Sequence, residues 1–572
     1  MPTLDWIGKQ AVVKHHKDVP YRLLEPVPEL SHGKPDCGNL IVQGDNLHAL
    51  KALLPRYAGK VKCVYIDPPY NTGNEGWVYN DNVNSPEIKK WLGELVGKEG
   101  ETLDRHDRWL CMMYPRLVML RQFLKDDGVI FISIDNAEIS NLRILMDEIY
   151  GENCFVECIA WNKRIPKNDA LIGNIHEYIL IYKKSSSSNI KFTMRKDGLD
   201  DVYELLDKCR NKGVPIEETE NKIRQLYKEK GLDRGVTLYN NLDSNYKLWG
   251  KINVSWPNGN TYGPTYEVLH PVTKKPVKMP DRGWRWKQDT FIELLKDGPI
   301  QKLQDGSIIY GKIWFSKDER TQPSSVKYLD EVENILLRSI LSLKSDGGMD
   351  LEDVFVKKNI FAYPKPINLI KLLINSVEMN DGDIVFDSFA GSGTTALATM
   401  ELNSEDQIKR NFICIEMLED IAKDITAERC RKVSVGYENS KSEAIHGTGF
   451  NFQYCKLSKE PTFDDNGQVR ADVGFKQLAE FVWFVETGTG FTGRGDSPLL
   501  GIHEGRAIYL LYNGILKDKS VDGGNVLTTP VLNVLPKYDG ACVIYAAACR
   551  LGTARLNKLN IVFKQTPYAL EV

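Results

Sequence analysis

The fold of this chain is decided by Val61-Lys62-Cys63-Val64-Tyr65-Ile66, which runs directly into Asp67-Pro68-Pro69-Tyr70. An apolar run that ends in a rigid Pro-Pro turn is typical of a buried strand that delivers side chains to a sheet edge. The turn suits a pocket for a flat ring with an exocyclic amine. Asp67 and the Pro68 carbonyl can each accept one amine N–H, while Tyr70 stacks on the ring. The alternative is a strand-to-loop turn whose acid caps a local group.

A second motif, farther along the chain, is Val385-Phe386-Asp387-Ser388-Phe389-Ala390-Gly391-Ser392-Gly393-Thr394-Thr395. We expect a strand before its glycines and a helix rich in Ala, Leu and Thr after them. Glycines in such a place let the backbone approach a bound ligand. The next expected strand, 411–415, ends in Glu416, where α/β nucleotide-binding units place a carboxylate on a ribose diol. Taken alone, the loop also suits a dinucleotide, or a tight turn that packs helix on strand.

The Asp-Pro-Pro-Tyr box and the glycine loop together resemble the S-adenosylmethionine-dependent amino-methyltransferases of DNA. The box precedes the loop, an order that resembles the beta class. Further matching stretches are Gly44-Asp45-Asn46-Leu47, 113–117, 128–135, 176–180 and Tyr363-Pro364-Lys365-Pro366. The resemblance covers residues 35–190 and 255–425. More narrowly, the length, Gly283-Trp284-Arg285-Trp286 and the long C-terminal region resemble the modification subunit of type III restriction systems.

This resemblance implies a reaction and a set of site residues. The reaction is methyl transfer from S-adenosylmethionine to the N6 amine of an adenine flipped out of duplex DNA. The implied catalytic residues are Asp67, Pro68, Pro69 and Tyr70. The expected cofactor residues are Asp45, Asn46, Lys365, Pro366, Asp387, Phe389, Gly391, Gly393, Thr394, Thr395 and Glu416.

The motifs fit some alternative activities better than others. Cytosine N4 is also an exocyclic amine, so a cytosine-N4 methyltransferase is the alternative, although a box with Asp first and Tyr last resembles the adenine group more often. Methylation at cytosine C5 needs a thiolate that follows a proline in that family, and none of the eleven cysteines follows one. An NAD-dependent dehydrogenase gives the box no role. A catalytically silent DNA-recognition or assembly subunit of the same fold is the competitor from another class.

We expect an α/β fold: a Rossmann-like methyltransferase sheet assembled from two sequence segments, with an inserted α+β target-recognition region and a small C-terminal α/β domain. The expected domains are an irregular N-terminal arm at 1–36, the catalytic half at 37–190, the target-recognition region at 191–350, the cofactor-binding half at 351–440 and a C-terminal assembly domain at 441–572.

Composition fits a globular protein of more than one domain. The 572 residues are 42% hydrophobic and 26% charged. No run approaches 18 apolar residues and the N-terminus has no apolar signal region, so we expect no membrane association and a cytoplasmic location. Cys154 and Cys158 are spaced C-x3-C without a second pair or nearby histidines. We therefore expect no metal site and a reducing compartment.

The net charge of −3 hides an uneven distribution. Residues 161–330 carry 30 Lys and Arg against 22 Asp and Glu, which favours a segment that faces phosphates, although solvated helix faces account for part of this excess. The expected DNA contacts are Trp77, Lys274, Lys275, Lys278, Arg282, Trp284, Arg285 and Lys287. For Trp284 the alternative is an indole that packs a small sheet. The expected partners are double-stranded DNA, a second copy in a homodimer and a helicase-nuclease restriction subunit.

Overall fold

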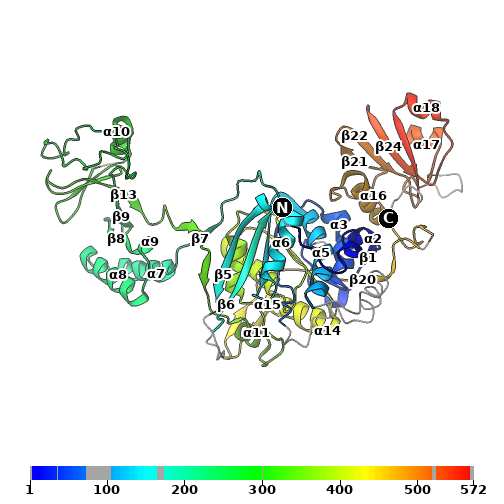
Figure 1. The fold of residues 1–572 in the computed structure, drawn as a ribbon, viewed down its shortest axis with the longest axis horizontal. Coiled ribbons are helices and arrows are strands. Elements are labelled where there is room, and N and C mark those ends of the chain that lie inside the picture. The colour runs from blue at the N-terminus through cyan, green and yellow to red at the C-terminus, as the bar shows by residue number, and fades with distance from the viewer. Residues whose placement is uncertain are drawn as a thin grey trace. The chain divides into compact units, whose positions relative to one another are not determined.

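The chain divides into two compact units. The structure, a computed structural model, describes residues 3–34, 37–72, 105–163, 173–298, 300–464, 466–517 and 524–566. The first unit combines Met1–Phe192 with Arg338–Val572, and the second is Thr193–Leu337 (Figure 1). The second unit is therefore inserted between two segments that fold together.

The first unit is built on a ten-stranded sheet. Its strands lie in the order β1 (Arg22–Pro26), β20 (Gln453–Pro461), β2 (Leu40–Gln43), β17 (Asn411–Glu416), β16 (Ile384–Asp387), β3 (Val61–Ile66), β4 (Leu124–Ile134), β6 (His176–Lys183), β5 (Phe155–Asn162) and β15 (Ile340–Ser342). The strands from β20 to β4 are parallel, and β6 is antiparallel to both of its neighbours. Because β16 lies between β17 and β3, the sheet is assembled from both sequence segments, as predicted.

The parallel strands bring the two motifs together. β3 ends at Ile66, immediately before the Asp-Pro-Pro-Tyr box, and its neighbour β16 ends at Asp387, immediately before the glycine loop. The next strand, β17, ends at Glu416. Carboxyl ends of parallel strands meet at one edge of a sheet, where α/β folds bind their ligands. One sheet edge therefore carries box, loop and acid.

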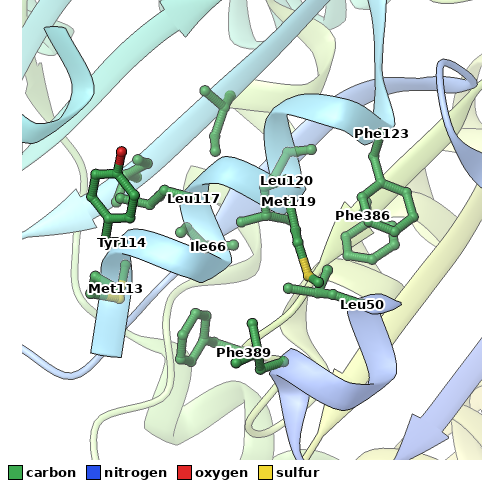
Figure 2. Packing of buried hydrophobic residues seen from close by; sticks show 14 of the residues in the cluster. Leu50, Ile66, Met113, Tyr114, Leu117, Met119, Leu120, Phe123, Phe386 and Phe389 are labelled. Carbon is green, nitrogen blue, oxygen red and sulfur yellow. The ribbon is translucent and has the colours of Figure 1, made fainter. Parts of the chain in front are cut away.

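Helices cover both faces of this sheet. Along β17, Ile413 and Ile415 face one hydrophobic core while Phe412 and Cys414 face another, as strand alternation requires. The first core contains α3 (Asn46–Tyr57), α5 (Arg105–Phe123) and α6 (Ile139–Tyr150). Figure 2 shows its centre, where Phe123 of α5 lies 4.9 Å from Phe386 of β16 between ring centroids. The second core contains α13 (Thr394–Asp406) and α15 (Glu428–Val435).

Three strands extend the sheet beyond the expected segments. The expected irregular arm at 1–36 contains α1 (Lys9–Val12), α2 (His15–Asp18) and β1, which pairs with β20. β20 comes from the segment expected for assembly, and β15 from the segment expected for target recognition. These pairings cover edges that would otherwise present unpaired N–H and C=O groups.

The second unit is α+β, as predicted. Its helices α7 (Leu199–Asn211) and α8 (Ile216–Lys230) are labelled in Figure 1. They bury Leu206, Ile223 and Tyr227. The six antiparallel strands of its sheet are β10 (Ile300–Lys302), β11 (Ile308–Tyr310), β12 (Ile313–Phe315), β13 (Ser324–Tyr328), β9 (Leu248–Asn253) and β8 (Tyr239–Leu242). β7 (Thr193–Arg195) pairs with β14 (Asn334–Leu336) where the chain enters and leaves the unit.

The C-terminal part forms a small α/β layer, as predicted. Its sheet is β21 (Leu499–His503), β22 (Arg506–Leu510), β24 (Ala541–Ala546) and β26 (Ile561–Gln565). α16 (Phe475–Thr487) packs on it through Leu478, Phe481 and Val482. The N–H of Gly490 donates to Ala58 O, just past α3, at 3.0 Å. In the described part of the chain, no helix combines the length and the apolar character needed to cross a membrane.

Candidate active site

The Asp-Pro-Pro-Tyr box leaves one carboxylate oxygen available. Asp67 Oδ2 accepts from Lys365 Nζ at 2.8 Å. Its other oxygen, Oδ1, is buried and has no hydrogen-bond partner among the described residues. The Trp109 indole N–H donates to Pro69 O at 2.7 Å, and this hydrogen bond holds the Pro-Pro turn in place. A buried acceptor without a donor is costly unless a ligand supplies one, so Oδ1 is placed to receive an N–H or O–H.

Tyr70 is held by charged groups from outside the box. Its hydroxyl donates to Glu177 Oε2, on β6, at 3.0 Å. Lys365 Nζ lies 4.8 Å from the centroid of the Tyr70 ring and 3.5 Å from Glu177 Oε2. Lys163 also donates to Glu177. Glu177 and Lys365 therefore contact Tyr70, and Lys163 binds Glu177 in turn. Neither Glu177 nor Lys163 was predicted as a site residue.

Burial and charge oppose one another in this cluster. Burial raises the pKa of Asp67 above its usual value, and the charge of Lys365 opposes that rise. Burial acts to raise the pKa of Glu177 as well, but Lys365 and Lys163 outweigh it and lower the pKa. The two carboxylates raise the pKa of Lys365 although burial acts to lower it. The lysine is thus held as an ammonium between the two carboxylates.

The residue after the box is held in a left-handed backbone conformation. Asn71 has φ +56° and its buried side chain donates to Glu138 and to Arg105 O, the latter at 3.2 Å. His106 Nδ1 lies 2.6 Å from the same Glu138 carboxylate. Asn tolerates positive φ better than other residues except Gly, and the buried carboxylate fixes it there. This network sets the direction in which the chain leaves Tyr70.

The glycine loop has the backbone that its sequence predicts. Gly391 and Gly393 have φ +50° and +77°, a region that branched residues avoid. Glu416 Oε2 accepts from Gly391 N at 2.8 Å, and Oε1 accepts from Leu418 N at 3.0 Å. The acid thereby fixes the loop.

Two predicted cofactor residues brace this loop from inside. Asp387 Oδ1 accepts from Phe389 N at 2.9 Å, and Oδ2 accepts from the Thr395 hydroxyl. Burial raises the pKa of Asp387 to about 7. Beside it, the Ser388 hydroxyl is buried and finds no partner in the described ranges. The orphaned hydroxyl, the glycine loop and Glu416 fit a nucleoside ligand such as S-adenosylmethionine.

Asp45 and Asn46 lie next to the same loop. Asp45 caps α3 by accepting from Leu47 N and His48 N, both at 3.0 Å. Asn46 Nδ2 lies 3.4 Å from Ser388 O, and its Oδ1 accepts from the buried Arg116. Arg116 therefore positions a predicted cofactor residue, and its only signal in the sequence was an arginine inside the apolar stretch 113–117.

Lys365 joins the two motifs rather than serving the loop alone. Its carbonyl accepts from the Thr394 hydroxyl at 3.3 Å, and Pro366 then starts α12 (Ile367–Asn375). Its side chain, however, reaches Asp67 in the box. We predicted Lys365 as a cofactor residue; the structure places its charge beside the Asp-Pro-Pro-Tyr box, and the cofactor role stays a prediction.

Most of the predicted DNA contacts are exposed on the second unit. They are Lys274, Lys275, Lys278, Arg282, Arg285 and Lys287. The prediction for Trp284 is wrong, because its indole is 0% exposed, donates to Tyr266 O at 2.8 Å and stacks on the Tyr266 ring. Tyr262, which we did not predict, is 80% exposed. Trp77 lies outside the described residues. The described chain contains no group of three or more His, Cys, Asp or Glu side chains arranged to hold a metal ion.

Comparison with known proteins gives consistent matches. The sequence model of a DNA methylase family matches residues 61–428. The chain is 33% identical to the Mod subunit of the type III restriction-modification enzyme EcoP15I from Escherichia coli, over 74% of this chain and 65% of that protein. It is 31% identical to the EcoPI Mod subunit from Escherichia phage P1, over 93% of this chain and 79% of that protein. The chain thus spans just under two thirds of the first relative and more of the second.

A solved structure also matches. The PvuII DNA methyltransferase, which is cytosine-N4-specific, covers 71% of this chain and 88% of its own at 11% identity, with a TM-score of 0.33. A likeness this weak says nothing about which base is methylated.

Proposed function

The chain belongs to the DNA methylase family, which it shares with type III Mod subunits, and from this membership we propose that it transfers a methyl group from S-adenosylmethionine to the N6 amine of adenine in duplex DNA. The observation that carries the proposal is the juxtaposition of Asp67, with its buried and unsatisfied Oδ1 in the described chain, and the glycine loop on the adjacent strand end.

S-adenosylmethionine supplies a methyl group already activated on a sulfonium. The residues that would hold it are Gly391, Gly393 and Glu416 at the loop, with Asn46 alongside. Since the donor is activated, the protein mainly has to align the amine with the methyl carbon and to manage charge.

Asp67 and the Pro68 carbonyl make the amine nucleophilic. An aromatic amine is a poor nucleophile because its lone pair is delocalised into the ring. Acceptance of its two N–H protons by Asp67 Oδ1 and Pro68 O favours a pyramidal nitrogen, whose lone pair forms the new N–C bond. Asp67 Oδ1 would take the surplus proton from nitrogen, and bound S-adenosylmethionine would supply the methyl group and keep the electron pair of its C–S bond on sulfur. These contacts strengthen as positive charge develops on nitrogen, so they stabilise the transition state selectively.

The choice of base rests on the box. The order Asp-Pro-Pro-Tyr favours adenine N6 over cytosine N4, which is the alternative because it presents the same NH2 group. The target atom is inaccessible inside a duplex, so the base must be flipped into the pocket, where Tyr70 replaces part of its lost stacking. A catalytically silent subunit has no use for an Asp67 that a lysine holds with its Oδ1 buried.

The second unit binds the duplex in this proposal. The exposed Lys274, Lys275, Lys278, Arg282, Arg285 and Lys287 offer cations to phosphates. The exposed ring of Tyr262 adds a group that can stack on bases or enter a groove. Apart from β15 and β20, which lie in the ten-stranded sheet, we assign residues 191–350 to target recognition, 37–190 and 351–440 to the methyltransferase, and 441–572 to assembly.

The assembly proposed is a homodimer that serves a helicase-nuclease restriction subunit. The relatives' names place Mod subunits within restriction-modification enzymes, and the C-terminal layer carries none of the catalytic motifs. Light scattering of the purified chain tests the dimer: twice the chain mass supports it, and a monomer that methylates DNA at full rate removes it without affecting the activity.

The reaction is tested with the purified chain, S-adenosylmethionine and mixed-sequence duplex DNA. The DNA is hydrolysed to nucleosides and analysed by mass spectrometry. N6-methyldeoxyadenosine is the expected product. N4-methyldeoxycytidine instead would show that the methylated base is cytosine. The methyltransferase proposal would be refuted if the DNA contained no methylated nucleoside and calorimetry detected no binding of S-adenosylmethionine.

A further inference from the structure

The box depends on charged residues that come from distant parts of the chain. Lys365 lies just before α12 and Glu177 lies on β6, yet both side chains reach the Asp-Pro-Pro-Tyr turn at the end of β3. Lys365 Nζ is 2.8 Å from Asp67 Oδ2 and 3.5 Å from Glu177 Oε2. Both lysine and glutamate side chains are about nine-tenths buried. A charged bridge this well shielded from water acts strongly on both carboxylates.

The bridge also decides which atoms are left for the substrate. An ammonium group is a donor only, so Lys365 occupies Oδ2 and leaves Oδ1 as the acceptor for an amine. The same ammonium covers one face of the Tyr70 ring, at 4.8 Å from the centroid. The Tyr70 hydroxyl is tied to Glu177 at 3.0 Å, which fixes the ring plane. A base can then stack only on the opposite face.

We propose that Lys365 and Glu177 are positioning residues for methyl transfer: Lys365 holds Asp67 through Oδ2, and Glu177 holds Lys365 and Tyr70. This inference rests on the proposed function. It gives Lys365 a role in the catalytic pocket that is separate from cofactor binding. It also gives a role to Glu177, to which the sequence motifs assign none.

The charges around Asp67 make opposite predictions for the two residues. The titratable groups that face Asp67 are Lys365, Glu177, Tyr70, Tyr65 on β3 and Asp387 on β16. Among these, Lys365 lowers the pKa of Asp67 and Glu177 raises it. Asp67 accepts the amine protons only when it is ionised, so the rate rises with pH through the pKa of Asp67. Removing the lysine charge must move this acidic limb to higher pH, and removing the glutamate charge must move it to lower pH.

The test compares Lys365→Met, Glu177→Gln and the double variant with the wild-type chain. Single-turnover methylation of a duplex is measured from acid to alkaline pH, and S-adenosylmethionine affinity is measured by calorimetry. We expect the limb to rise by about one to three pH units in Lys365→Met, the effect of one close opposite charge. It should fall in Glu177→Gln and lie between the two in the double variant. The affinity for S-adenosylmethionine should stay within about threefold of the wild-type value, because the Lys365 charge lies at the Asp-Pro-Pro-Tyr box and not at the glycine loop.

A matched control comes from the same segment. Lys371, on α12, is also partly buried between two carboxylates, Glu401 and Glu405, but lies outside the pocket. Lys371→Met should leave the limb where it is. If Lys365→Met does not fold, as judged by circular dichroism, Glu177→Gln and the charge-neutral double variant still decide the sign.

Several results would overturn the inference. Limbs that do not move, or that move in the same direction in both single variants, would make Lys365 and Glu177 merely structural. Loss of cofactor binding in Lys365→Met would return the lysine to the cofactor site. A wild-type chain that methylates no DNA at any pH would overturn the proposed function itself, and that outcome is seen without any variant.

Discussion

Replacement of Asp67 probes the contact on which methyl transfer depends. In Asp67→Ala the acceptor is lost, while Lys365 keeps Glu177 as its partner at 3.5 Å. Asp67→Asn is more informative. Because Lys365 can only donate, the amide oxygen must turn toward it, and the amide NH2 then takes the place of Oδ1. The two N–H donors of the new amide would then face the N–H donors of the substrate amine. The isosteric Asp67→Asn variant should therefore be as inactive as Asp67→Ala.

The expected loss follows from one transition-state contact. Removing such a contact typically slows a reaction by about a hundredfold or more, which corresponds to about 2.7 kcal/mol. Single-turnover transfer of a labelled methyl group to duplex DNA measures it. Cofactor affinity should change by less than about threefold, because Asp67 lies outside the glycine loop. Activity of Asp67→Ala within about threefold of wild type would show that Asp67 is not the acceptor. A nearly active Asp67→Asn would show that Lys365 does not dictate which oxygen is used.

Three further predictions concern the ring, the cofactor and the duplex. Tyr70→Ala should slow methylation more than Tyr70→Phe, which keeps the stacking ring and loses the hydroxyl contacts with Glu177 and Asp67; equal losses would assign the role to the hydroxyl. Gly391→Val and Gly393→Val should abolish S-adenosylmethionine binding in calorimetry because both positions have positive φ. Glu416→Ala should weaken it by about 1–3 kcal/mol, and unchanged affinity in all three variants would move the cofactor elsewhere, while NAD should not bind. Arg282→Ala and Arg285→Ala should weaken binding to any duplex and each reduce the salt slope by about 1, whereas Trp284→Ala should leave that slope unchanged and lower the melting temperature.

The parts of the site that the sequence predicts are those with local signals. A Pro-Pro turn after an apolar run, and glycines between a strand and a helix, determine backbone shape within a few residues, and the structure has both at the predicted strand ends. Trp284 was misjudged because an aromatic beside arginines has the same composition whether its ring is exposed or packed.

Contacts between distant segments could not be predicted in this way. Lys365 and Asp67 are far apart in the chain, and no pattern around either indicates that the lysine side chain turns from the loop into the box. Glu177 is an acid near the start of the largely apolar strand β6, and the sequence of that strand does not indicate which residues bind it. The pairing of β1 with β20 likewise joins two segments that are far apart in the sequence. Short strands of ordinary composition carry no signal of the register in which they pair.

Long-read sequencing of DNA from cells that express this chain, beside cells that express Asp67→Ala, tests the central claim most directly. It reports the modified base and its sequence context together. We predict N6-methyladenine within one recurring sequence in the first sample and unmodified adenine at the same sites in the second. Methylated cytosine in place of adenine, or the same adenine methylation in both samples, would contradict the account.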